Sequence, residues 1–147
     1  MIESVLVVCE GNICRSPLAC AMLAQSLPGI EFSSAGTHAL VGEGAHPIIA
    51  EMAREHGVQL EEHVASQLTD ERVRSADLIL TMTKQQREQI ERAWPFARGK
   101  VFRLTESEGV DVVDPYRRHR ATFELAVAQI EHSVARWRGV LAAQQVD

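Results

Sequence analysis

The chain has 147 residues, a length that suits a single domain, 1–147, built around one hydrophobic core. Hydrophobic residues make up 46% of the chain and charged residues 24%, and its formal net charge of -5 argues against a general nucleic-acid-binding protein. The N-terminus has no signal-peptide pattern and no apolar stretch is long enough to span a membrane, so we expect a cytoplasmic protein without membrane insertion.

The first predicted elements are a strand, a turn and a helix. Residues 3–8 are rich in Val and Leu and predict a buried strand that ends at a glycine-containing turn. Ser16 and Pro17 predict the start of a helix, with Ser16 as N-cap and Pro17 at the first helical position. An apolar stripe continues this helix as far as Pro28, after which the pattern predicts a strand at 30–36, a loop at 37–47 and a helix at about 47–57.

The second half of the chain repeats the alternation of strands and helices. Its predicted elements are a strand at 76–82, a helix at about 84–94, a strand at 100–104, a long polar loop at 105–120 and a helix at about 119–143. This alternation favours an α/β fold, a three-layer sandwich in which a central four-stranded parallel sheet is flanked by helices. Ligands of such sheets bind at the carboxyl ends of the strands, where residues 9–16 are expected to lie.

All the cysteines of the chain, Cys9, Cys14 and Cys20, lie within its first 20 residues. An odd number of clustered cysteines does not make a disulfide framework, which leaves cysteine chemistry or metal binding. No Cys-x-x-Cys or His-x-x-x-His pair occurs, so we expect no metal and no other cofactor. Cys20 falls beside the apolar stripe of the first helix and is predicted to be a core residue.

The turn between the first strand and the first helix has the composition of an oxyanion cradle. Backbone N–H groups and the positive end of the helix dipole point at one spot, and Gly11 would allow these amides to converge. The Arg15 guanidinium can grip two oxygens of a phosphate or an arsenate. Cys9 would lie at the floor of this phosphate-binding loop as a thiolate, ready for nucleophilic attack.

Taken alone, Cys9 after a buried strand is more often a small core residue than a nucleophile. Arg15, Gly11 and the polar turn before a helix start reverse that preference in favour of a nucleophile. For Cys14 two interpretations stay open. It is either a packed loop residue or the partner that captures an oxidised Cys9 in a disulfide and so protects it.

Transfer of a phosphoryl group to sulfur also needs an acid for the leaving group and later a base for water. Asp114 in the segment VVDPYRR is the candidate, because Pro115 restricts its backbone to an extended conformation. A lone Asp-Pro pair would be an ordinary turn, but this one follows the fourth strand of a chain that already has a cradle. Asp111 is the competitor and lacks a following proline.

At this point the chain resembles the low-molecular-weight protein tyrosine phosphatases. The resemblance covers nearly the whole chain, through the segments VVCEGNICRSP, SSAGTHALVGEGAHP, HVASQLTDE, ADLILTM and DPYRR. It implies that Cys9 is a nucleophile forming a phosphocysteine, that Arg15 clamps the phosphate, and that Asp114 is general acid and then base. It further implies a hydrogen-bond network that shapes the loop and supports the thiolate, formed by Asn12, Ser16, Ser34 and His63.

Within the family, the segment HALVGEGAHP resembles the bacterial branch linked to capsule and exopolysaccharide production. This branch implies that Leu40 and Tyr116 form the pocket walls and that the partner is a phosphotyrosine protein, a bacterial tyrosine autokinase. Relatives acting on phosphoarginine carry threonine at the position of Ile13, so Ile13 favours phosphotyrosine. Glu10 departs from the neutral residue of many members and should point outward or weaken phosphate binding. The substrate-binding residues implied in this way are Glu10, Gly11, Asn12, Ile13, Cys14, Ser16, Leu40 and Tyr116.

Other functions compete with this prediction. A thiol-linked arsenate reductase of the same fold would relay a disulfide through two further cysteines, and no cysteine follows Cys20. A non-catalytic phosphate-binding or scaffold protein would be expected to lack one of Cys9, Arg15 and Asp114. A phosphocarrier of sugar transport needs neither a clamp like Arg15 nor a leaving-group acid like Asp114. We expect a monomer or weak self-association.

Overall fold

The computed structural model describes residues 1–145, and residues 146 and 147 of the predicted domain lie outside the described residues. Its strands are β1 (Ser4–Cys9), β2 (Glu31–Gly36), β3 (Leu78–Thr81) and β4 (Val101–Arg103). They form one parallel sheet in the order β2-β1-β3-β4. The predicted four-stranded parallel sheet is confirmed, and β1 occupies one of its two central positions.

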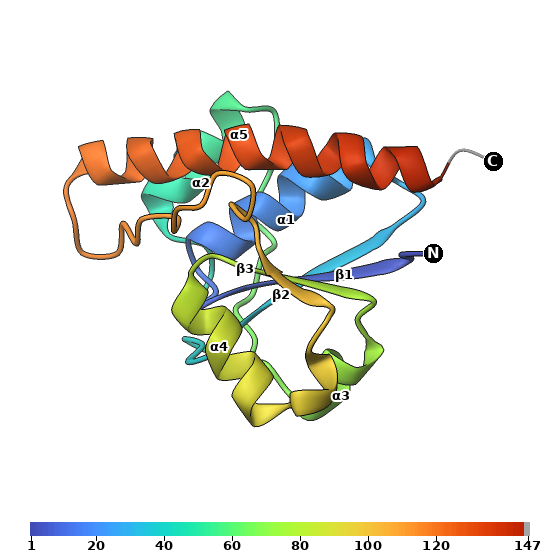
Figure 1. Cartoon of the computed structure of the whole chain (residues 1–147). Helices are drawn as coiled ribbons and strands as arrows, with labels where there is room; N and C mark the ends of the chain where they lie inside the picture. The colour runs from blue at the N-terminus through green and yellow to red at the C-terminus, as the bar shows by residue number, and fades with distance from the viewer. Residues whose placement is uncertain (146–147) are drawn as a thin grey trace.

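Helices cover both faces of the sheet, as the predicted three-layer sandwich requires (Figure 1). One layer holds α1 (Arg15–Ser26), α2 (Pro47–Glu55) and the long C-terminal α5 (Arg120–Gln144). The opposite layer holds α3 (Asp70–Ser75) and α4 (Lys84–Ala93), with a short 3₁₀ turn at Pro95–Ala97 after α4. Within residues 1–145, no helix has the length and apolar character needed to cross a membrane.

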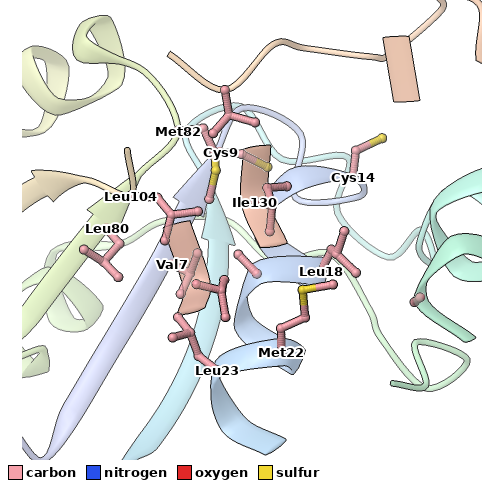
Figure 2. Packing of buried hydrophobic residues seen from close by; sticks show 14 of the residues in the cluster. Val7, Cys9, Cys14, Leu18, Met22, Leu23, Leu80, Met82, Leu104 and Ile130 are labelled. Carbon is pink, nitrogen blue, oxygen red and sulfur yellow. The ribbon is translucent and has the colours of Figure 1, made fainter. Parts of the chain in front are cut away.

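The alternation of side chains along β1 explains why both faces need cover. Val5 and Val7 point into the core under α1 and α5, whereas Leu6 and Val8 point into the smaller core under α3 and α4. Figure 2 shows part of the larger core, with Val7 and Cys9 from β1 close to side chains of α1, among them Leu18, Met22 and Leu23. Burial on both faces makes β1 a rigid base for the turn that follows Cys9.

The start of α1 differs from the prediction. The helix begins at Arg15 with Cys14 as N-cap, so Ser16 is not the cap and Pro17 is not the first helical residue. The hydroxyl of Ser16 is buried and makes hydrogen bonds inside the loop that precedes the helix. A serine whose hydroxyl is bonded to side chains inside the loop cannot also accept from the first backbone N–H groups of the helix. The sequence pattern is the same for both uses.

The sequence also failed to predict α3. This helix has only six residues and buries a single side chain, Val73, so it leaves no apolar period to recognise. Its start is nevertheless encoded, because the Thr69 side chain accepts a hydrogen bond from the Arg72 backbone N–H. The long loop at 105–120 is confirmed, since only turns and irregular backbone lie between Leu104 and His119.

Candidate active site

The turn that joins β1 to α1 is closed by a residue in the left-handed conformation, and that residue is Asn12, with φ 59°. Gly11 does not have a positive φ, so the prediction that glycine supplies the unusual backbone was wrong. Asparagine tolerates this region better than most residues because its short amide can bond locally. Asn12 is completely buried, which makes the shape of the turn depend on the partners of its side chain.

Cys9 ends β1 and its thiol is buried at the base of the turn. The Ser16 hydroxyl lies 2.9 Å from Sγ, and the backbone N–H of Asn12 donates to Sγ at 3.3 Å. The Ser16 hydroxyl also accepts from the Asn12 Nδ2 at 2.8 Å, which leaves its single proton to point at the sulfur. Two donors aimed at one sulfur stabilise negative charge on it.

The side chain of Asn12 connects the turn to β2 and to the segment before α3. Its Nδ2 also donates to the Ser34 hydroxyl at 3.0 Å, and its Oδ1 accepts from the Ser66 backbone N–H at 2.9 Å. The His63 Nε2 lies 2.6 Å from the Asn12 carbonyl oxygen and donates to it. The structure therefore brings Asn12, Ser16, Ser34 and His63 together, and adds Ser66, which the sequence did not indicate.

Arg15 opens α1 and is almost fully buried. Its Nη1 donates to the Val112 carbonyl at 3.0 Å, which ties the guanidinium to the loop between β4 and α5. Its Nη2 faces Asp114 Oδ2 at 3.6 Å. One contact thus orients the guanidinium, and the other brings together two charged groups that are far apart in the sequence.

Asp114 and its competitor Asp111 have different surroundings. The Asp114 Oδ1 accepts from the Tyr116 backbone N–H at 3.1 Å, and its half-exposed carboxylate lines the same pocket as Cys9. Asp111 accepts instead from the Lys84 backbone N–H at 2.9 Å and pairs with Arg103 at 3.0 Å. Its carboxylate is therefore engaged with the start of α4 and the end of β4 and does not line the Cys9 pocket.

These groups surround a pocket of about 100 Å³ at the carboxyl ends of the strands, lined by Cys9, Glu10, Gly11, Ile13, Cys14, Arg15, His38, Leu40, Asp114 and Tyr116. Asn12 and Ser16 were also predicted to contact substrate, but their side chains are buried behind the lining. His38 was missed, and no sequence pattern marks it. The pocket fits a small anion at its base with a flat apolar group between its walls.

The end of β2 lies unusually close to the turn. The backbone N–H groups of Thr37 and His38 donate to the carbonyls of Cys9 and Glu10, each at 2.9 Å. A Cβ atom on Gly36 would lie 2.4 Å from the Glu10 carbonyl oxygen, a separation that side chains do not tolerate. Gly36 is therefore required where β2 meets the turn. Leu40, four residues further along the chain, lines the pocket.

The other two thiols differ from Cys9 in their surroundings. Burial raises the pKa of Cys14 to about 12, with smaller increases from Cys9 and Asp114 and an opposing effect of Arg15. Burial likewise raises the pKa of Cys20 to about 11. Cys20 is only partly buried at the edge of the core. Among residues 1–145, no three His, Cys, Asp or Glu side chains gather as metal ligands would.

Known proteins resemble this chain in both sequence and fold. The family model described as "Low molecular weight phosphotyrosine protein phosphatase" matches residues 4–146. Probable low molecular weight protein-tyrosine-phosphatase EpsP of Ralstonia nicotianae is 48% identical over 137 residues, which cover 93% of this chain and 94% of EpsP. Low molecular weight protein-tyrosine-phosphatase Wzb of Escherichia coli K12 is 42% identical over 147 residues, 99% of this chain and all of Wzb (100%).

A solved structure agrees with these matches. The tyrosine phosphatase AmsI of Erwinia amylovora superposes with a TM-score of 0.91 at 39% identity, covering 95% of this chain and 93% of AmsI. Fold and sequence together define a hydrolase of phosphoric monoesters. The chain belongs to the low molecular weight phosphotyrosine protein phosphatases and is a protein tyrosine phosphatase.

Proposed function

We propose that Cys9, Arg15 and Asp114 carry out the phosphatase reaction of this chain. The observation that supports this most directly is that a thiol, a guanidinium and a carboxylate from two distant segments line one pocket of about 100 Å³. The Cys9 sulfur attacks the phosphorus of phosphotyrosine, so that an S–P bond forms while the bond from phosphorus to the tyrosine oxygen breaks. Asp114 gives its proton to that departing oxygen.

The second half of the reaction restores the enzyme. Asp114, now a carboxylate, takes a proton from a water molecule as that water attacks the phosphocysteine. A new P–O bond forms and the S–P bond breaks. Phosphate is released, and Cys9 is again a thiolate. Donation from the Ser16 hydroxyl and the Asn12 N–H stabilises this sulfur both as nucleophile and as leaving group.

Arg15 serves as the phosphate clamp. Its guanidinium has five donors in a rigid plane, one of which is engaged with the Val112 carbonyl. The remaining donors on the pocket side match two oxygens of a phosphoryl group. The same guanidinium lies 3.6 Å from Asp114, so a phosphoryl group bound to it is also close to the acid.

The pocket walls favour an aryl phosphate. Leu40 and Tyr116 contribute apolar surface to the pocket lining. Ile13 adds a third apolar side chain at the position where phosphoarginine phosphatases resembling this loop carry threonine. A phenyl ring is held between such walls by burial of apolar surface. A guanidinium group in the same place would lack a hydroxyl partner, which supports phosphotyrosine over phosphoarginine as substrate.

The partner we propose is a tyrosine-phosphorylated bacterial autokinase of exopolysaccharide export, which this chain would dephosphorylate in the cytoplasm. The support for it is the likeness of this chain to EpsP, Wzb and AmsI, together with the resemblance of the HALVGEGAHP segment to that branch of the family. The chain acts as one domain, as a monomer or with weak self-association. Removal of phosphotyrosine from the isolated phosphorylated kinase domain tests this partner, and stable phosphotyrosine in its presence would contradict it.

Hydrolysis of para-nitrophenyl phosphate and a phosphotyrosine peptide without added metal tests the reaction. Cys9→Ser should abolish turnover, and acid quenching of the wild-type reaction should leave phosphate bound to Cys9 in a mass spectrum. Full activity of Cys9→Ser would overturn the mechanism. Faster hydrolysis of phosphoarginine than of phosphotyrosine, or thiol-dependent arsenate reduction exceeding phosphatase turnover, would overturn the substrate assignment instead.

A further inference from the structure

We propose that Arg72 of α3 is a positioning residue for the phosphate-binding turn, acting on Asn12 through Ser34 and Ser66. The inference rests on the proposed role of the turn and of Cys9 in the reaction. Arg72 does not line the pocket, and in the sequence it is one of two arginines in a short polar helix. Its importance follows from the atoms that its guanidinium contacts.

The guanidinium of Arg72 holds two separate segments together. Its Nη1 donates to the Ser66 hydroxyl at 2.7 Å, and its Nη2 donates to the Ser34 carbonyl at 2.8 Å. The Ser66 hydroxyl in turn donates to the same Ser34 carbonyl at 3.3 Å. The side chain is partly withdrawn from solvent, and this burial lowers the pKa of Arg72 from its ordinary value. Hydrogen bonds from a partly buried charged donor are stronger than those at a free surface.

The two residues held by Arg72 are the ones that fix the Asn12 amide from outside the turn. Ser34 accepts from Asn12 Nδ2 and Ser66 donates to Asn12 Oδ1, so the spacing of these two partners sets where the amide lies. Asn12 holds the left-handed backbone of the turn and donates to the Cys9 sulfur. A conformation that is intrinsically unfavourable persists only when its surroundings hold it in place. Arg72 is the outer part of those surroundings.

The chemistry of arginine suits this task. One planar group reaches a hydroxyl and a carbonyl at once, whereas the single ammonium of lysine is a point charge on a flexible stem. The neighbouring Arg74 provides the matched comparison on the same helix. It is exposed, pairs with Asp70 at 2.7 Å and lies 4.3 Å from the ring of Phe96, with no contact to the turn.

The test compares Arg72→Ala, Arg72→Lys and Arg74→Ala in the full chain. Its readouts are kcat/KM for para-nitrophenyl phosphate, the inhibition constant of inorganic phosphate and the melting temperature. For Arg72→Ala we expect kcat/KM to fall about tenfold and phosphate to bind more weakly by a similar factor, the size of change typical for a network residue outside the site. Arg72→Lys should recover part of both losses. Arg74→Ala should leave both values as in the wild type.

Added guanidinium ion makes the test specific. A depression of about 270 Å³ lies beside Arg72, lined also by Ser33, Glu71 and Ser75, so a small cation can reach the place that Arg72→Ala leaves. Millimolar guanidinium should restore part of the activity of Arg72→Ala and none of that of Arg74→Ala. If Arg72→Ala does not fold, Ser66→Ala removes the hydroxyl that Nη1 contacts, together with the bond from that hydroxyl to the Ser34 carbonyl, and should weaken phosphate binding in the same direction.

A residue that only stabilises the fold would give a different pattern. A lowered melting temperature with unchanged kcat/KM and phosphate affinity well below that temperature would overturn the proposal, as would failure of both lysine and guanidinium to restore activity. Failure of the proposed function can be told apart from failure of this proposal. In that case Cys9→Ser would keep its activity, whatever residue stands at position 72.

Discussion

The Nη2 atom of Arg15 lies 3.6 Å from the Oδ2 atom of Asp114, although the two side chains differ sharply in exposure, at 4% and 49%. The buried guanidinium is held in place by the Val112 carbonyl, and the carboxylate is held by the Tyr116 backbone N–H. The contact therefore joins the floor of the pocket to the loop that follows β4. It also places the proposed acid next to the group that we propose binds phosphate.

Replacing Asp114, the proposed general acid, should affect the chemical step and leave substrate binding almost unchanged. For Asp114→Asn we expect kcat on a phosphotyrosine peptide to fall by roughly 10²–10⁴-fold, because the leaving tyrosine oxygen loses its proton donor, while KM changes little. Steady-state kinetics measure both values. Asp111→Asn is the control and should stay near wild type, since Asp111 is engaged with Lys84 and Arg103. A larger loss of kcat in Asp111→Asn than in Asp114→Asn would show that Asp114 is not the acid.

Two substitutions of Asn12 separate its backbone from its side chain. Asn12→Gly keeps the left-handed conformation accessible but removes the amide, whereas Asn12→Ala removes both advantages. We expect both variants to lose about tenfold or more in kcat/KM, and Asn12→Ala to be less stable than Asn12→Gly by about 1 kcal/mol. Kinetics and denaturant unfolding measure these effects. Wild-type activity in Asn12→Gly would show that the hydrogen bonds of the amide are not needed.

Glu10 is an exposed residue that lines the pocket proposed to bind a phosphate dianion. Glu10→Gln should lower KM for para-nitrophenyl phosphate by roughly two- to fivefold at low salt, and this gain should shrink as salt screens the charge. Glu43→Gln is the matched control, since Glu43 is exposed in the neighbouring loop and does not line the pocket. An unchanged KM at low salt would mean that the Glu10 carboxylate points away from the bound phosphate.

Mild peroxide is expected to link Cys9 to Cys14, which are both free thiols in the structure. Burial raises the pKa of Cys14 to about 12, so its thiolate is scarce at neutral pH and becomes more abundant as pH rises. The disulfide should therefore form slowly at pH 7 and faster at pH 9, in competition with a sulfenic-acid trap. Mass spectrometry measures both products. Oxidised acids on Cys9 alone, at both pH values, would remove the protective role of Cys14.

A pair of glycine substitutions tests the close approach of β2 to the turn. Gly36→Ala forces a Cβ to within 2.4 Å of the Glu10 carbonyl oxygen, so we expect a loss of about 1–3 kcal/mol in stability together with reduced activity. Gly139→Ala lies in the exposed part of α5, where nothing is within 4 Å, and should stabilise the protein by about 0.5–1 kcal/mol with full activity. Thermal unfolding and kinetics of both variants check the contrast.

Local signals explain why so much of the site could be predicted from the sequence. Cys9 and Arg15 are six positions apart on either side of one turn, and the roles proposed for them follow from the strand and helix that flank it. Asp114 is recognisable because Pro115 restricts its backbone to an extended conformation. The order of apolar strands and amphipathic helices was sufficient to predict the parallel sheet and its layers.

The errors arise where one residue type serves several uses. Ser16 has the pattern of a helix cap, but its hydroxyl donates to the Cys9 sulfur and accepts from the Asn12 Nδ2. Only the packed turn distinguishes these two uses. Gly11 was expected to carry the unusual backbone, which belongs to Asn12 because a network of side chains holds that residue there. The helix α3 was missed since six residues with one buried side chain carry no period.

The sequence alone therefore determines the order of the elements, the turn with its thiol and guanidinium, and the Asp-Pro pair, because each depends on neighbours within a few positions along the chain. Only the tertiary structure decides that Asp114 meets Arg15, that Gly36 touches the turn, and that Ser66 and Arg72 support Asn12. These relationships join segments that are separated in sequence. They exist because sheet pairing and core packing bring the carboxyl ends of the strands to one edge.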